Sequence, residues 1–212
     1  MTASDPDRLL ARVGDYYAAR LDAHGPTPLG VDWPCRPTQE LRFVQLLKGC
    51  DFSAPFSLND LGCGYGALRT FMAGRWPDAA VDYLGIDLVP GMIRQASRRW
   101  RKRPDTHFAE GTRCTRVADH CVASGIFNVK LDLSREAWTR YIQATLTDMW
   151  ASSRRGFAVN FLTADGEGNG DVAELYRTAP DEWLNFCAQE LGVSASILAS
   201  YGMREFTLIA RK

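Results

Sequence analysis

The sequence lacks an excess of charge of either sign. Its 212 residues include 25 Lys and Arg and 25 Asp and Glu, so the formal net charge at pH 7 is zero. Proteins that bind nucleic acid usually carry a basic excess that neutralises phosphates, so the composition argues against nucleic acid as a partner. There is one local cluster of cations, Arg94, Arg98, Arg99, Arg101, Lys102 and Arg103. We interpret this cluster as the solvated C-terminal end of a helix, with an RNA-contacting surface as the alternative.

Long apolar runs, zinc-type cysteine spacing and the apolar core of a secretory leader are also missing. No apolar run approaches the roughly 18 residues of a membrane span, and the N-terminal stretch MTASDPDRLL is polar. The six cysteines form no C-x-x-C pair and have no histidines at the spacing of zinc ligands. We therefore expect no membrane partner, no metal and reduced thiols in a cytoplasmic protein. The oligomeric state is left open.

The overall composition, 46% apolar and 24% charged, is that of an ordinary globular protein. A chain of this length suits one domain over 1–212. We expect an N-terminal helical lid segment, 1–55, over a core formed by 56–212. In the lid segment, helices at about 5–23 and 38–48 flank an irregular stretch rich in Gly and Pro, 25–37.

From residue 56 onward, short apolar runs alternate with segments of helical length. Such alternation predicts strand-helix-strand units and a mostly parallel sheet. The expected strands are 57–61, 81–86, 107–109, 120–123, 156–162, 194–199 and 204–210, and the expected helices are 67–75, 91–101, 135–152 and 181–191. The last two strands are joined by a tight turn at Tyr201-Gly202, so they must be antiparallel. Ligands of such sheets bind beyond the carboxyl ends of the strands.

The strongest local signal is DLGCGYG, residues 60–66, where the first strand of this core runs through a glycine-rich turn into a helix. Glycines permit positive φ and close approach of a ligand, and the first amides of the helix are free to donate hydrogen bonds. The second signal is Asp87, at the end of the next strand, where cofactors that contain adenosine have their ribose hydroxyls bound. The alternatives are a ligand-free turn for the loop and a simple strand-end cap for Asp87.

The run GCGYGA also fits the dinucleotide fingerprint G-x-G-x-x-G/A, which leaves a nicotinamide enzyme open. Asp60 favours a different ligand, because a carboxylate at the mouth of the loop would oppose a pyrophosphate but could hold the cationic amino end of S-adenosylmethionine.

DLGCGYG followed by YLGIDLVPGMI resembles the first two motifs of the class I S-adenosylmethionine-dependent methyltransferases. The resemblance implies an α/β, Rossmann-like three-layer sandwich whose mostly parallel seven-stranded sheet has an antiparallel last strand. It also implies a set of cofactor-binding residues. Asp60, Gly62, Cys63 and Gly64 would line the methionine part, Asp87 would take the ribose hydroxyls, Leu88 and Met92 would flank the adenine, and Thr112 and Ser124 would follow the third and fourth strands.

This sequence departs from the family pattern at two places. Thr112 stands where an acid often receives the adenine amine. Residues 123–128, ASGIFN, replace the Asn/Asp-Pro-Pro-aromatic signature of enzymes that methylate nucleobase amines or glutamine amides. We therefore expect a different acceptor, a small molecule methylated on oxygen or nitrogen.

Few residues are candidates for choosing and activating that acceptor. Of the three histidines, His107 and His120 begin strands and are interpreted as structural, whereas His24 in the irregular segment is the candidate general base or an exposed helix-end residue. Candidate substrate residues are Tyr17, Trp33, Asn128 and Asn160. Either asparagine could instead satisfy loop amides. Arg42 would pair with the cofactor's carboxylate or be an ordinary surface charge.

Two other functions are compatible with the sequence. A short NAD(P)-dependent oxidoreductase could use the same loop, although Tyr141 is not followed by a lysine four residues later as in many short reductases. A non-catalytic module could bind the adenosyl cofactor, or RNA through the arginine cluster.

Overall fold

The computed structural model describes residues 6–164 and 174–212. The polar first five residues, including the expected start of the first helix, lie outside this range. The helices are α1 (Pro6–His24), η1 (Pro28–Val31), α2 (Arg36–Leu46), η2 (Leu47–Gly49), α3 (Ala67–Arg75), α4 (Pro90–Trp100), α5 (Arg135–Ala151) and α6 (Pro180–Glu190). The strands are β1 (Phe56–Leu61), β2 (Val81–Asp87), β3 (Thr106–Glu110), β4 (Ala118–Ala123), β5 (Ser153–Thr163), β6 (Arg177–Thr178), β7 (Ala195–Leu198) and β8 (Glu205–Arg211).

The strands form one mixed sheet in the order β3-β2-β1-β4-β5-β8-β7. The pairs among β1 to β5 are parallel, and β8 is antiparallel to both of its neighbours. The predicted mostly parallel sheet with an antiparallel last strand is therefore confirmed. The two-residue β6, which pairs with the end of β5, was not predicted because two residues carry no alternation pattern.

Local signals explain where several helices begin. Pro90 and Pro180 stand in the first turns of α4 and α6, where the missing amide hydrogen of proline leaves no bond unmade. The Ser134 hydroxyl accepts a hydrogen bond from the Ala137 amide at 3.2 Å and caps the start of α5.

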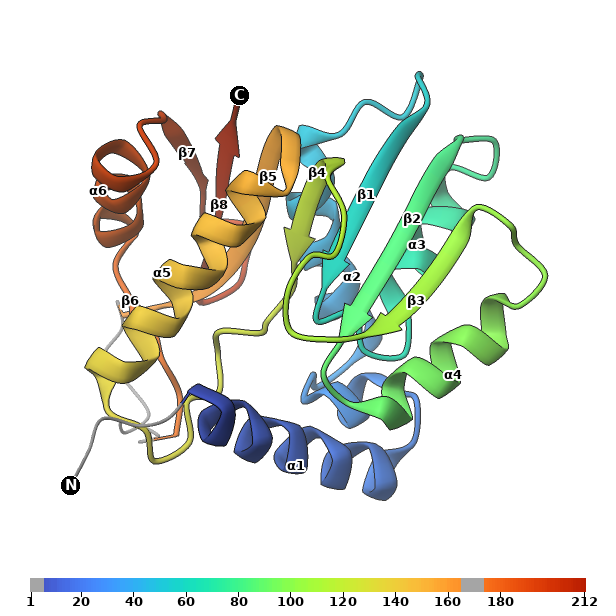
Figure 1. Cartoon of the computed structure of the whole chain (residues 1–212), viewed down its shortest axis with the longest axis horizontal. Coiled ribbons are helices and arrows are strands. Elements are labelled where there is room, and N and C mark those ends of the chain that lie inside the picture. Colours follow the sequence, from blue (N-terminus) through green and yellow to red (C-terminus); the bar gives the residue numbers. More distant parts are fainter. Residues whose placement is uncertain (1–5, 165–173) are drawn as a thin grey trace.

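Helices cover both faces of the sheet, and their apolar side chains form two cores. On one face, Phe43 of α2 and Leu68 of α3 pack in a cluster with strand residues such as Leu58. On the other face, Trp138 of α5 and Trp183 of α6 belong to a larger cluster. The result is a three-layer sandwich, and α1 lies across the carboxyl ends of the parallel strands (Figure 1).

Neither a membrane span nor a metal cluster is found in the described ranges. Among the helices of residues 6–164 and 174–212, none is both long and apolar enough to cross a bilayer. The same residues contain no group of three or more His, Cys, Asp or Glu side chains that could hold a metal ion.

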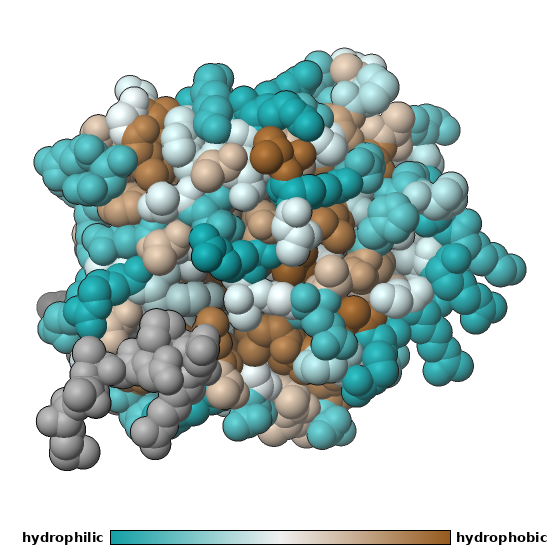
Figure 2. Space-filling model, in the orientation of Figure 1, coloured by the Kyte–Doolittle hydropathy of each residue, from teal (hydrophilic) through white to brown (hydrophobic). Residues whose placement is uncertain are grey.

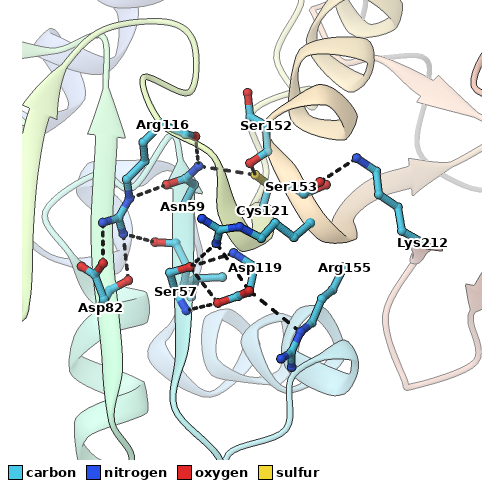
Figure 3. Close-up of polar contacts among 12 residues, drawn as sticks. Ser57, Asn59, Asp82, Arg116, Asp119, Cys121, Ser152, Ser153, Arg155 and Lys212 are labelled. Carbon is cyan, nitrogen blue, oxygen red and sulfur yellow. Dashed lines mark hydrogen bonds and ion pairs between the residues drawn. The ribbon is translucent and has the colours of Figure 1, made fainter.

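The opposite edge of the sheet, where the parallel strands begin, is held by Arg116 (Figure 3). Its guanidinium donates to the Asn59 side chain at 3.1 Å and to the Asp82 side chain at 2.7 Å, and so joins β1 to β2. Asn59 is fully buried and returns a hydrogen bond to the Arg116 carbonyl at 2.9 Å. The amino ends of the strands are thus fixed without any group from the opposite end of the sheet. We call that opposite end, where the parallel strands end, the carboxyl edge.

We expect Asn59→Ala to lower the free energy of unfolding by about 1–3 kcal/mol, because it leaves polar groups around Arg116 without their buried partner. Asp82→Ala removes the other partner of Arg116, but the Asp82 side chain is 56% exposed, so the loss should stay below about 1 kcal/mol. Urea denaturation of both variants measures the two values. Equal losses would contradict this account of the edge.

Candidate functional site

The glycine loop after β1 is held against the end of β2. The amides of Gly62 and Cys63 both donate to the Ile86 carbonyl, at 2.7 and 3.0 Å. Gly62 has a φ of +73°, and a Cβ on it would lie 2.1 Å from a methyl carbon of Ile126. Both the backbone angle and the close approach of the loop after β4 therefore require glycine here.

Asp87 connects this loop to the start of the next helix. One carboxylate oxygen accepts from the Gly64 amide at 2.8 Å, and the other accepts from the Val89 amide at 2.9 Å. The side chain is buried, and burial raises the pKa of this carboxyl group, whereas the hydrogen bonds from the two backbone amides act to lower that pKa. The two amides orient the carboxylate and leave further lone pairs for a ligand.

Asp60 is the second buried carboxyl group of the site. It is 1% exposed and accepts a hydrogen bond from the Tyr83 hydroxyl. Burial raises its pKa to about 7, with a smaller contribution in the same direction from the charge of Asp87. A cationic ligand would therefore favour the ionised form.

An open cavity lies at the carboxyl edge, with an empty volume of about 920 Å³ that includes space open to solvent. The lining includes all of the sequence-predicted cofactor residues except Arg42, namely Asp60, Gly62, Cys63, Gly64, Asp87, Leu88, Met92, Thr112 and Ser124. Two predicted substrate residues, Tyr17 and Trp33, also line it. The Ser124 hydroxyl is buried without a hydrogen-bond partner among the described residues, so it is available to a ligand.

Four other candidates do not line the cavity. The Arg42 side chain is 5% exposed and pairs with Glu205 of β8 at 2.6 Å, so it is neither a surface charge nor directed at the cavity. The Asn160 side chain accepts a hydrogen bond from the Gly125 amide at 2.8 Å. Of the two roles expected for Asn160, it therefore has that of satisfying a loop amide. Asn128 is buried, and its side-chain oxygen has no partner among the described residues. His24 ends α1 away from the lining.

Several lining residues were missed by sequence reasoning. Tyr65 lies in the glycine loop itself, and its hydroxyl donates to the Gln39 side chain of α2 at 3.2 Å. Tyr141 comes from α5 and is close enough to Asp87 for the carboxylate to contribute to its raised pKa of about 12, although burial is the main cause. Tyr65 could have been found from its place in the motif. Tyr141 could not, because only the packing of α5 brings it to this edge.

The arginine cluster lies elsewhere, along α4 and the turn after it. Its six cations are exposed and none of them lines the cavity. Figure 2 shows hydrophilic side chains gathered over the right-hand side of the molecule, where α4 lies. This is the arrangement expected of a solvated helix end.

Comparison with known proteins gives three informative similarities, although no family model matches the chain. The chain is 42% identical over 158 residues to a Mycobacterium tuberculosis protein named "Putative methyltransferase Rv1506c", a match that covers 74% of this chain and 94% of that protein. It is 37% identical over 75 residues to trans-aconitate 2-methyltransferase of Rhodococcus jostii, covering 30% of this chain and 29% of that enzyme. Its fold is similar to that of magnesium protoporphyrin IX methyltransferase from Synechocystis PCC 6803 crystallised with S-adenosylmethionine, with a TM-score of 0.68, 13% identity and full coverage of both chains.

We expect Gly62→Ala to lower the free energy of unfolding by about 1–3 kcal/mol, because the added methyl group meets Ile126 and the backbone is held at positive φ. Gly74→Ala is the matched control, since no atom lies within 4 Å of the added carbon in α3 and alanine favours a helix. Denaturation curves of the two variants should move in opposite directions. A shift of the same sign and size in both would show that the loop does not require glycine at residue 62.

Proposed function

Because the chain belongs to the class I S-adenosylmethionine-dependent methyltransferases, we propose that it transfers a methyl group from S-adenosylmethionine to an oxygen or nitrogen of a small, uncharged acceptor. The observation that carries the proposal is the juxtaposition of Asp60, Asp87 and the Gly62–Gly64 turn around one cavity. These groups come from two neighbouring parallel strands, β1 and β2, which end at the same edge.

The residues present fit this cofactor. Asp87 would accept the ribose hydroxyls, while Asp60 would hold the cationic amino group and the glycine loop would give the methionine part close access to the backbone. Leu88 and Met92 would flank the adenine, and the unpartnered hydroxyl of Ser124 offers a further hydrogen bond. The cofactor supplies an already activated methyl group on a sulfonium, so the protein's main task is alignment.

The lining also supports an uncharged acceptor. Aromatic rings of Tyr17, Trp33 and Phe43 contribute to it, whereas no Lys, Arg or His is among the described lining residues. An anionic acceptor would therefore find no cationic side chain to pair with in this described part of the lining. The match to trans-aconitate 2-methyltransferase covers only 30% of the chain, too little to transfer that enzyme's acceptor to this protein.

We assign no general base in this proposal. Burial raises the pKa of the lining tyrosines Tyr17, Tyr65 and Tyr141, so they stay protonated at neutral pH and can donate hydrogen bonds. The candidate base His24 lies outside the lining. Orientation of the acceptor in line with the methyl group would then provide most of the rate, by an effect worth about 7–11 kcal/mol in well-positioned systems.

The N-terminal segment acts as a lid in this proposal. It contributes Val13, Tyr17, Val31, Trp33 and Gln39 to the lining, and α1 lies over the carboxyl edge (Figure 1). Asp32 is bonded to the Tyr16 hydroxyl at 2.6 Å and to Arg20 at 2.9 Å, so the stretch after η1 is fastened to α1.

We expect the protein to bind S-adenosylhomocysteine, the demethylated product, and Asp87→Asn to weaken this binding about tenfold to a hundredfold, since charge-assisted hydrogen bonds contribute about 1.5–3 kcal/mol each. Asp82→Asn changes an exposed acid in the same strand and should leave the affinity unchanged. Isothermal calorimetry measures all three proteins. Absence of binding by the unaltered protein, or equal affinity for reduced NAD(P), would overturn the proposed cofactor. A product screen with labelled cofactor and pools of neutral metabolites then identifies the acceptor.

The raised pKa of Asp60 predicts how this binding depends on pH. Binding of a cationic amino group requires the ionised carboxylate, so the affinity should rise up to tenfold per pH unit below about pH 7 and level off above it. In the unliganded protein, the free energy of unfolding depends on pH in the opposite sense. Protonated Asp60 contributes stability that is lost as the pH rises to about 7. Asp60→Asn should bind more weakly and lose the slope. A slope that persists in this variant would assign the titration to another group.

A further inference from the structure

Five residues from separate segments contact one another in a closed ring behind the cavity wall. Trp33 follows η1, Arg42 belongs to α2, Glu205 to β8, Asn160 to β5, and Gly125 to the loop after β4. Trp33 and Gly125 line the cavity, whereas the other three residues do not.

The first half of the ring joins Trp33 to Glu205 through Arg42. The Arg42 guanidinium carbon lies 3.5 Å from the centre of the Trp33 ring, which is a close cation-π contact. The same guanidinium donates to a Glu205 oxygen at 2.6 Å, and the two side chains are only 5% and 1% exposed. The Arg42 guanidinium therefore contacts a partner on each side and is almost fully buried.

The second half joins Glu205 to Gly125 through Asn160. The Asn160 amide nitrogen lies 3.4 Å from the Glu205 oxygen that receives Arg42, and its amide oxygen accepts from the Gly125 amide at 2.8 Å. The ring closes because Trp33 lies directly on Gly125, where an added Cβ would be 2.4 Å from the indole. Gly125 has a φ of +77°, so residues with a side chain are excluded on two grounds.

The ring lies on one half of the carboxyl edge. The residues proposed to hold the methionine, ribose and adenine parts follow β1, β2 and β3. Within the ring, Asn160 belongs to β5, Glu205 to β8 and Gly125 to the loop after β4, and these three strands lie on the other side of β1 in the strand order. Apart from Ser124, which also follows β4, the proposed cofactor contacts lie on the β1 to β3 side, so the wall formed by Trp33 and Gly125 lies toward the other half of the edge.

We infer that Arg42, Glu205 and Asn160 are positioning residues that hold Trp33 and Gly125 as the acceptor-side wall of the cavity. This inference rests on the proposed methyltransferase function. A buried ion pair is a weak source of stability, because the cost of removing two charges from water offsets their attraction. Its value here is geometric, since a displacement of about 1 Å in an alignment-driven reaction can lower the rate about a hundredfold.

The test uses one substitution in each half of the ring. Arg42→Lys keeps the charge facing Glu205 but removes the flat guanidinium that stacks on Trp33. Asn160→Ala removes the hydrogen bond to the Gly125 amide. Arg69→Lys is the matched control, because Arg69 is also buried and lies over another indole, that of Trp100, at 4.7 Å. Spectra of ¹⁵N-labelled protein report the Trp33 indole and the Gly125 amide of each variant, and thermal denaturation shows that each variant is folded.

The expected result is coupling through the ring. Arg42→Lys should shift the Gly125 amide signal, although Trp33 stands between these two residues in the ring. Asn160→Ala should likewise shift the signal of the Trp33 indole, from which Gly125 separates it. Arg69→Lys should shift neither. The inference is overturned if each substitution moves only the signal of its own neighbour.

Binding and kinetics separate this inference from the proposed function. Both ring variants should bind S-adenosylhomocysteine within about twofold of the unaltered protein, whereas kcat/KM for the acceptor found in the product screen should fall about tenfold to a hundredfold with an unchanged KM for the cofactor. If the two signals are coupled but the protein does not bind S-adenosylhomocysteine, the connection through the ring is supported and the proposed function is overturned. If the protein binds S-adenosylhomocysteine but the signals are not coupled, the proposed cofactor is supported and the inference about the ring is overturned.

Discussion

The hydrogen bond from the Gly64 amide to the Asp87 carboxylate is the contact on which the site depends. It joins the turn after β1 to the end of β2, two strands whose register already places Leu61 beside Ile86. A buried carboxylate needs donors, and the amides of Gly64 and Val89 provide them without a side chain that would fill the cavity. One acid thus satisfies the loop, fixes its own orientation and stays available to a ligand.

The strand order separates the groups proposed for the cofactor from those that support the opposite wall of the cavity. β1 to β3 end in the groups proposed for the cofactor, and β4, β5 and β8 support the opposite wall through a buried polar ring. α1 lies across the carboxyl ends of these strands (Figure 1). At the amino ends of the strands, Arg116 connects β1 to β2 through its hydrogen bonds to Asn59 and Asp82 (Figure 3). In the proposed methyl transfer, which depends mainly on alignment, a wall held in place by packing would matter more than a proton acceptor.

Sequence reasoning succeeded where the information is local. The strand, glycine turn and helix from 56 to 75, the acid that ends β2 and the antiparallel last pair were all predicted, because each is encoded by neighbouring residues. Contacts between distant segments were harder to predict. Arg42 has the spacing of a surface residue on an amphipathic helix, and only its contact with Glu205, 163 positions later, makes it a buried ion-pair partner.

By itself, the sequence determined the fold class, the glycine turn and the two strand-end acids, since short-range periodicity and backbone freedom depend on adjacent residues. Only the tertiary structure decided that Asp60 and Asp87 share a cavity with Tyr141, that His24 is outside it, and that Asn160 acts on Gly125. Burial, pKa and hydrogen-bond partners are properties of packed neighbours, and the packing of distant segments is set by the whole chain at once.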